Sequence, residues 1–228
     1  MTPSFAIVRG KMNEIEKKLR LRFEMLAREL TAAQAHIHLA QGLMDSIAEF
    51  QKELNEAPLF WGQTIQAHRT AAVASLCRVF DQHEASSNLA ELLIEIKKNV
   101  SVFDTEKFDD RYQGNPLRPS TNNARRPSQQ QLESDITFCR ESPDVRTLIN
   151  WRNEAFSHTN KRVTFGTLKL TESDPLHIEA LKRLMIKGFE ILNHYSTLFQ
   201  GSDYGGFWED VLDDYKVVLE ALRSGAKR

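Results

Sequence analysis

The chain of 228 residues contains only two cysteines, Cys77 and Cys139, and they form no spaced framework. Each falls inside a helical pattern, so we expect buried thiols in a reducing compartment rather than a disulfide scaffold. No stretch approaches the roughly 18 consecutive apolar residues of a membrane span. The first residues also lack the apolar core of a secretion signal. These absences predict a cytoplasmic protein that makes no use of the membrane.

The sequence also has no excess of one charge, because 30 basic and 31 acidic residues leave a formal net charge of −1. No global field therefore recruits nucleic acid or an acidic membrane, and any RNA site must be a local patch. The chain has no glycine-rich phosphate loop, no nucleotide fingerprint and no Cys/His metal spacing. We accordingly expect no cofactor and no bound metal. His36 and His38, two positions apart on a helix, diverge and are expected to be solvated or packed.

What the chain does have is helical periodicity. Apolar residues recur every three or four positions from Ile15 to Ile47. This predicts one long helix, or two with a break near Thr31, where Thr31 and Gln34 have the spacing of a capping box. Further helices are expected from Pro58 to near Asp81, from Ser87 or Asn88 to Lys98, over 129–140, from Ser142 to about His158, from Asp174 to Leu198, and from about Trp208 to Leu222. Residues 163–170 favour a short hairpin or extended stretch.

Residues 114–130 break every period, and their prolines and asparagines predict a loop. The loop carries Arg118, Arg125 and Arg126 and no acid. One interpretation is a solvated connection. The other is a basic flap over a phosphate site, because long loops are either disordered or functional.

The helix that begins at Pro143 has one unusual residue. Its apolar stripe is formed by Val145, Leu148, Ile149, Ala155 and Phe156, and Arg152 falls near the middle of that stripe. A guanidinium at such a position is costly unless it is paired. Either Arg152 is a structural residue paired with an acid such as Asp81, with His158 closing the helix, or it binds a phosphate in a cleft.

The segment WRNEAFSHTN at 151–160 resembles the motif of the HEPN superfamily, an arginine followed after four to six residues by a histidine. Arg152, Asn153 and His158 match it. The blocks at 59–81 and 181–199 resemble helices of the abortive-infection (AbiU-type) branch, so the resemblance covers roughly residues 35–200. It departs from one subgroup, in which a tyrosine modified by a partner nucleotidyltransferase stands where this chain has Asn160.

The resemblance implies an all-α bundle of HEPN type that dimerises and cuts RNA without metal. Arg152, Asn153 and His158 would then be catalytic: histidine transfers a proton near neutral pH, and arginine neutralises the phosphorane. Arg152 and His158 lie about 120° apart on the helix, so two copies across a symmetric interface could complete one another.

Substrate contacts in such an enzyme would come from basic residues near the motif and in the loop. Lys161 and Arg162 are ordinary surface charges unless RNA binds beside them, and Arg125 and Arg126 are the loop counterparts. The expected partners are RNA, a second copy of the chain, and an antitoxin or other regulatory protein. The alternative is a non-catalytic module that keeps the fold for dimerisation or ligand sensing.

The expected organisation has three parts. Residues 1–30 form a helical arm that is either separate from the domain or continuous with it. Residues 31–200 form the HEPN-like domain. Residues 201–228 add a C-terminal helix that packs on the bundle or at a dimer interface.

Overall fold

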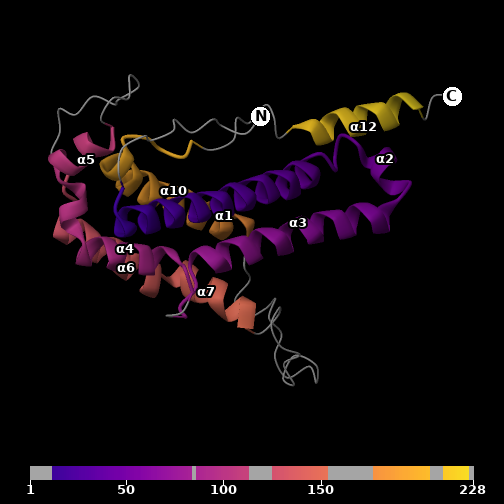
Figure 1. Ribbon diagram of the computed structural model, residues 1–228. Helices are drawn as coiled ribbons and strands as arrows, with labels where there is room; N and C mark the ends of the chain where they lie inside the picture. The colour runs from indigo at the N-terminus through magenta and orange to yellow at the C-terminus, as the bar shows by residue number, and fades with distance from the viewer. Residues whose placement is uncertain (1–11, 84–85, 113–124, 154–176, 206–212, 226–228) are drawn as a thin grey trace.

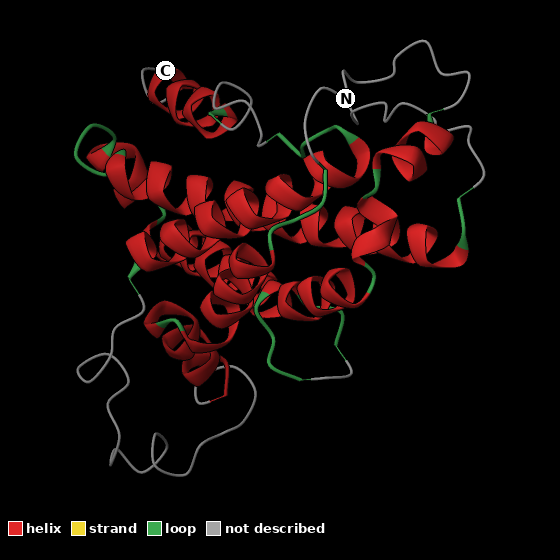
Figure 2. Ribbon diagram, turned by 90° about the vertical axis from the view of Figure 1, so that its left-hand side faces the viewer, coloured by secondary structure: helices red, strands yellow, loops and turns green. Residues whose placement is uncertain are grey.

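The computed structural model describes residues 12–83, 86–112, 125–153, 177–205 and 213–225. Throughout these ranges the regular structure is helical and contains no strand (Figure 2), which confirms the all-α prediction. None of the described helices has an apolar stretch long enough to span a bilayer. The stretch 163–170, for which an extended structure was expected, lies outside the described residues.

Two long helices form the centre of the bundle. Helix α1 (Glu14–Asp45) and helix α3 (Pro58–Val79) lie side by side, joined through the short helix α2 (Gln51–Asn55) (Figure 1). Helix α1 begins at a complete capping box between Asn13 and Glu16, and it continues through Thr31 without a break. The single long helix, rather than two, is therefore the correct alternative.

The first half of α1 contributes side chains to the core. Leu19, Phe23, Leu26 and Leu30 are each 0% exposed, and helix α10 (Ile178–Gln200) packs along them. Gly188 of α10 allows this approach, because a Cβ atom there would lie 2.7 Å from a methyl carbon of Leu30.

The remaining helices cover the ends and one face of this layer. Helix α4 (Leu89–Lys98), capped by Asn88, packs on helix α6 (Gln129–Glu141), capped by Ser128. Along the chain, α4 and α6 are connected through η1 (Val100–Phe103) and helix α5 (Thr105–Arg111). The periodicity of the sequence did not predict these two short elements. Helix α7 (Pro143–Trp151) contacts α3, α6 and α10.

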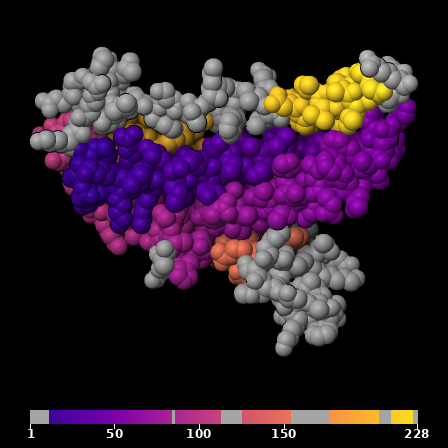
Figure 3. All heavy atoms as spheres, turned by 45° about the vertical axis from the view of Figure 1, so that its right-hand side comes forward, coloured from indigo at the N-terminus to yellow at the C-terminus, as the bar shows by residue number. Residues whose placement is uncertain are grey.

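Several helix ends differ from the expected ones. Helix α3 ends at Val79, and α10 begins at Ile178 because His177 is extended. The last helix, α12 (Asp214–Gly225), begins after a turn at Asp213. It packs on α1 and α2, where Leu219 joins a small second core with Leu43, Phe50 and Leu54. Helix α12 lies along one edge of the α1–α3 layer and α7 along the other (Figure 3).

Candidate functional site

Helix α7 carries the motif arginine, and the local sequence explains its position. Ser142 accepts a hydrogen bond from the Val145 backbone N–H, and Pro143 occupies the first turn. Val145 and Leu148 are both 0% exposed and fix one face of α7 in the core. Arg152 follows Leu148 by four positions, so its side chain leaves the helix on that same face.

The backbone changes at the motif itself. The α-helical segment ends at Trp151, and Arg152 and Asn153 continue in a π-helical turn. Such wider turns occur as local bulges, often at functional sites. The continuation of this helix to His158, expected from the sequence, lies outside the described residues, as do His158, Lys161 and Arg162.

Arg152 is paired with the carboxylate that the sequence suggested. Its Nη1 donates a hydrogen bond to Asp81 Oδ1 at 2.7 Å, and its Nε donates to Asn153 Oδ1 at 3.1 Å. No described residue accepts from Nη2. The Arg152 side chain remains 31% exposed and that of Asp81 20% exposed. The ion pair is therefore partly buried but open to solvent along one edge of the guanidinium.

Asp81 is held in place by the end of α3. Its Oδ1 also accepts hydrogen bonds from the backbone N–H groups of Gln82, at 2.8 Å, and His83, at 3.3 Å. Burial alone would raise the pKa of this carboxyl, but the hydrogen bonds from Arg152 and from the backbone lower it below its ordinary value. Asp81 is thus ionised near neutral pH and forms a fixed acceptor for Arg152.

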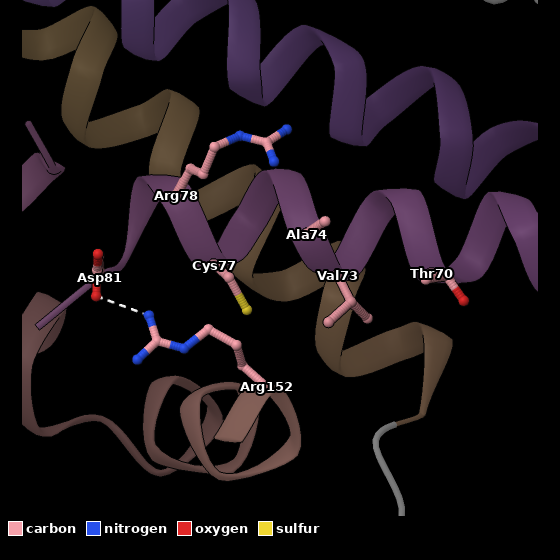
Figure 4. A pocket seen from close by; sticks show the side chains of 7 residues that line it. All are labelled: Thr70, Val73, Ala74, Cys77, Arg78, Asp81 and Arg152. Atoms are coloured by element: carbon pink, nitrogen blue, oxygen red, sulfur yellow. Dashed lines mark hydrogen bonds and ion pairs between the residues drawn. The ribbon is translucent and has the colours of Figure 1, made fainter. Parts of the chain in front are cut away.

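The pair borders a hollow of about 410 Å³ between α3 and α7. It is lined by Thr70, Val73, Ala74, Cys77, Arg78, Asp81 and Arg152. Figure 4 shows Arg152 reaching across from α7 while the Cys77 sulfur points toward the same space. Arg78 turns to the other side of α3, where it pairs with Glu29 of α1 at 2.8 Å. The hollow therefore has an apolar floor and one outward guanidinium edge.

Cys77 is not equipped to act as a nucleophile. Burial raises the pKa of its thiol to about 11, and this outweighs the opposing effect of the Arg152 charge. The thiol approaches the Leu148 carbonyl, with the sulfur 3.9 Å from the oxygen. Its role is to pack α3 on α7 beneath Arg152.

The two described loop arginines do not line this hollow. Arg125 is 8% exposed, stacks on the Phe108 ring at 3.2 Å and donates to the Thr197 and Leu198 carbonyls. These contacts are those of a structural side chain, not of the exposed phosphate contact that the sequence suggested. Arg126 is solvent-exposed and paired with Asp104. It borders a separate polar groove between α6 and α10.

The sequence analysis did not predict a buried cation that lies near the N-terminal end of α1. Arg111 is 2% exposed and pairs with Glu16, also buried, at 2.6 Å, while donating to the Val102 and Phe199 carbonyls. Phe108 and Tyr112, on either side of Arg111, are four positions apart, as on one face of a helix. This apolar spacing was the signal in the sequence that could have indicated a buried segment. Among the described residues no group of three or more His, Cys, Asp or Glu side chains could hold a metal ion.

Comparison with known protein families identifies a match. A family model described as AbiU2, of HEPN type, matches residues 16–228. The match extends beyond the range of about 35–200 that the resemblance covered, and it includes nearly all of α1 and the whole of α12. Neither the search of curated proteins nor that of solved structures produced a match.

Proposed function

The chain belongs to the HEPN-type AbiU2 family, a group related to abortive infection, and from this premise we propose that it is a metal-independent endoribonuclease. It would act as a toxin or abortive-infection effector. Family membership supports the fold and the biological setting. The activity is inferred from the motif and from the surroundings of Arg152.

The proposed reaction needs no protein nucleophile. The RNA 2′-hydroxyl attacks the adjacent phosphorus, so that the O2′–P bond forms and the P–O5′ bond breaks. The products are a 2′,3′-cyclic phosphate and a 5′-hydroxyl. His158 transfers the proton between the two oxygens, and Arg152 stabilises the additional negative charge. Asn153 holds Arg152 Nε and so fixes the plane of the guanidinium.

The observation that carries this proposal is the unused edge of Arg152. Asp81 accepts from Nη1 and Asn153 from Nε, and among the described residues Nη2 has no acceptor beside the open hollow. A guanidinium can bind a phosphate through two parallel N–H groups. Arg78 also borders the hollow but is turned toward Glu29, so Arg152 is the guanidinium group that faces this space.

We further propose that the active form is a homodimer in which two motif helices approach each other. On the regular helix that the sequence predicts, the arginine and the histidine of one motif would stand about 120° apart, so that a symmetric partner could complete the site. Lys161, Arg162 and the exposed Arg126 would contact phosphates along the RNA, and Arg125 would anchor the segment that precedes Arg126. Light scattering at micromolar concentration tests the dimer, and a purely monomeric protein would argue against it.

The Arg152–Asp81 ion pair favours one alternative, a non-catalytic helical module that dimerises or senses a ligand. In such a module Arg152 would serve only to join α7 to α3. The open edge of the guanidinium favours the enzyme, since a purely structural arginine would be expected to have its donors satisfied.

Incubation of the purified protein with total RNA in EDTA tests the proposal. We expect cleavage to persist and to leave 2′,3′-cyclic phosphate and 5′-hydroxyl ends, with His158→Ala as the inactive control. Cleavage by a folded His158→Ala protein at the wild-type rate would overturn the proposal and leave the interaction module as the better interpretation.

A further inference from the structure

Two histidines from different helices meet at the α1–α3 contact. His36 of α1 and His68 of α3 bring their Nδ1 atoms to 2.9 Å, and their ring centroids are 5.2 Å apart. Both side chains are partly exposed, so the pair is open to solvent. It is built on the two long helices α1 and α3, which lie side by side in the bundle (Figure 1).

The arrangement of the two rings suits a pair of metal ligands. At 2.9 Å one Nδ1 donates a hydrogen bond to the other. When that hydrogen is carried on the Nε2 of its ring instead, two nitrogen lone pairs are left that can face one ion. Neutral imidazole is the form of histidine that binds metals.

We propose that His36 and His68 form a two-histidine clamp for a first-row transition-metal ion such as Zn²⁺ or Cu²⁺. This site is separate from the hollow around Arg152, whose lining includes neither histidine. Its occupancy would join α1 to α3, and it plays no part in the proposed RNA cleavage.

The geometry requires only a small adjustment. Two nitrogens on a tetrahedral Zn²⁺ ion, each about 2.0–2.1 Å from it, lie roughly 3.3 Å apart. The 2.9 Å separation of the two Nδ1 atoms must therefore widen by a few tenths of an ångström, which a rotation of the two rings provides. Because both ligands stand on packed helices, little conformational entropy is lost on binding.

The donor set also limits which ions can bind. Within the described ranges no third His, Cys, Asp or Glu completes a cluster, so water would fill the other coordination positions. Mg²⁺ and Ca²⁺ prefer oxygen ligands and should not compete. Among divalent ions Cu²⁺ should bind more tightly than Zn²⁺, following the usual order for nitrogen sites.

Equilibrium dialysis of the chelator-stripped, full-length protein against Zn²⁺ tests the clamp. We expect one ion per chain, and a rise in Tm of roughly 5 °C at a Zn²⁺ concentration about one hundred times Kd. His36→Gln and His68→Gln should each weaken binding at least about tenfold, because each removes one of only two protein ligands.

His38→Gln is the matched control. His38 lies on the same helix, is partly exposed and pairs with Asp213 at 2.8 Å, so it is the rival histidine site. This variant should retain stoichiometric Zn²⁺ binding. Wild-type protein that binds no Zn²⁺, or binding unchanged in both clamp variants, overturns the proposal.

An NMR experiment on the wild-type protein tests the same site without any substitution, so it applies even where a clamp variant does not fold. Cu²⁺ is paramagnetic and broadens the NMR signals of nearby nuclei. Substoichiometric Cu²⁺ should first broaden the signals of residues around His36 and His68. First broadening around His38 or elsewhere contradicts the clamp.

Discussion

The Arg152 guanidinium reaches from α7 to α3 and donates to Asp81 at 2.7 Å, yet in the described part of the chain nothing accepts from its Nη2, which lies beside an open hollow. One residue thus joins two helices and keeps hydrogen-bonding capacity for an anion. The structural and the catalytic interpretations of Arg152 are compatible, because they use different nitrogens of the same group.

The ion pair between Arg152 and Asp81 predicts a loss of stability in the Asp81→Ala variant. Removing the carboxylate leaves a partly buried charge without its partner, which should lower the free energy of unfolding by about 1–3 kcal/mol. Urea unfolding followed by circular dichroism measures the change. Glu133→Ala breaks the exposed pair with Lys97 and should cost less than about 1 kcal/mol. Equal losses in the two variants would contradict the partly buried character of the Arg152 pair.

The same pair predicts acid sensitivity. Since the pKa of Asp81 is lower in the folded state, the unfolded chain takes up its proton first as the pH falls. The stabilisation by Asp81 is fully present above the ordinary pKa near 3.9 and is lost as the pH falls through the lower folded value. Below about pH 4 the wild type should therefore lose stability more steeply than Asp81→Asn, and parallel pH profiles would count against this assignment.

The proposed catalytic roles of Arg152 and His158 predict a graded set of RNA cleavage rates in variants of these two residues. His158→Ala should reduce kcat by about 10² to 10⁴-fold, the usual contribution of general acid–base catalysis. Arg152→Lys keeps the charge but loses the planar fork, so its activity should fall between those of the wild type and Arg152→Ala. Single-turnover cleavage of a labelled RNA measures the series. Full activity in Arg152→Lys would show that a point charge is enough.

The close approach of α1 and α10 predicts opposite effects of one substitution at two glycines. Gly188→Ala brings a Cβ atom to 2.7 Å from fully buried Leu30 and should cost about 1–3 kcal/mol. Gly62→Ala, in the interior of α3, meets nothing within 4 Å and should stabilise by about 0.5–1 kcal/mol through helix propensity. Thermal unfolding compares them. A stabilised Gly188→Ala protein would mean that the α1–α10 contact is looser than described.

The two thiols should be nearly inert in the folded protein. Burial raises the pKa of Cys77 to about 11 and that of Cys139 to about 12. At pH 8 the thiolate fraction of Cys77 is then about two orders of magnitude below that of a free thiol, and alkylation should be slowed accordingly. Guanidinium-unfolded protein, in which both thiols react rapidly, serves as the control. A fast native phase assigned to Cys77 would show that it is more exposed or more acidic than the structure indicates.

Most of the helices followed from the sequence because their signals are local. Periodicity from Ile15 to Ile47 and the caps at Asn88 and Ser142 involve residues within one turn of each other. The elements that were missed, α2, η1 and α5, are only five, four and seven residues long, too short for a period to emerge. The sequence also indicated that Arg152 needs a partner. A charged residue within the apolar stripe of a helix can be recognised from that helix alone.

Pairings between helices depended on the tertiary structure. His36 appeared next to His38 as a poor pair, and only the register of α1 against α3 brings it to His68. Arg125 looked like a free loop cation until the fold stacked it on Phe108. The sequence alone thus determined which segments are helical and which charge needed compensation. Apart from Asp81, which the sequence offered as one candidate partner of Arg152, packing decided which side chains meet. Contacts between segments far apart in the chain depend on how whole helices align, and no local pattern encodes that alignment.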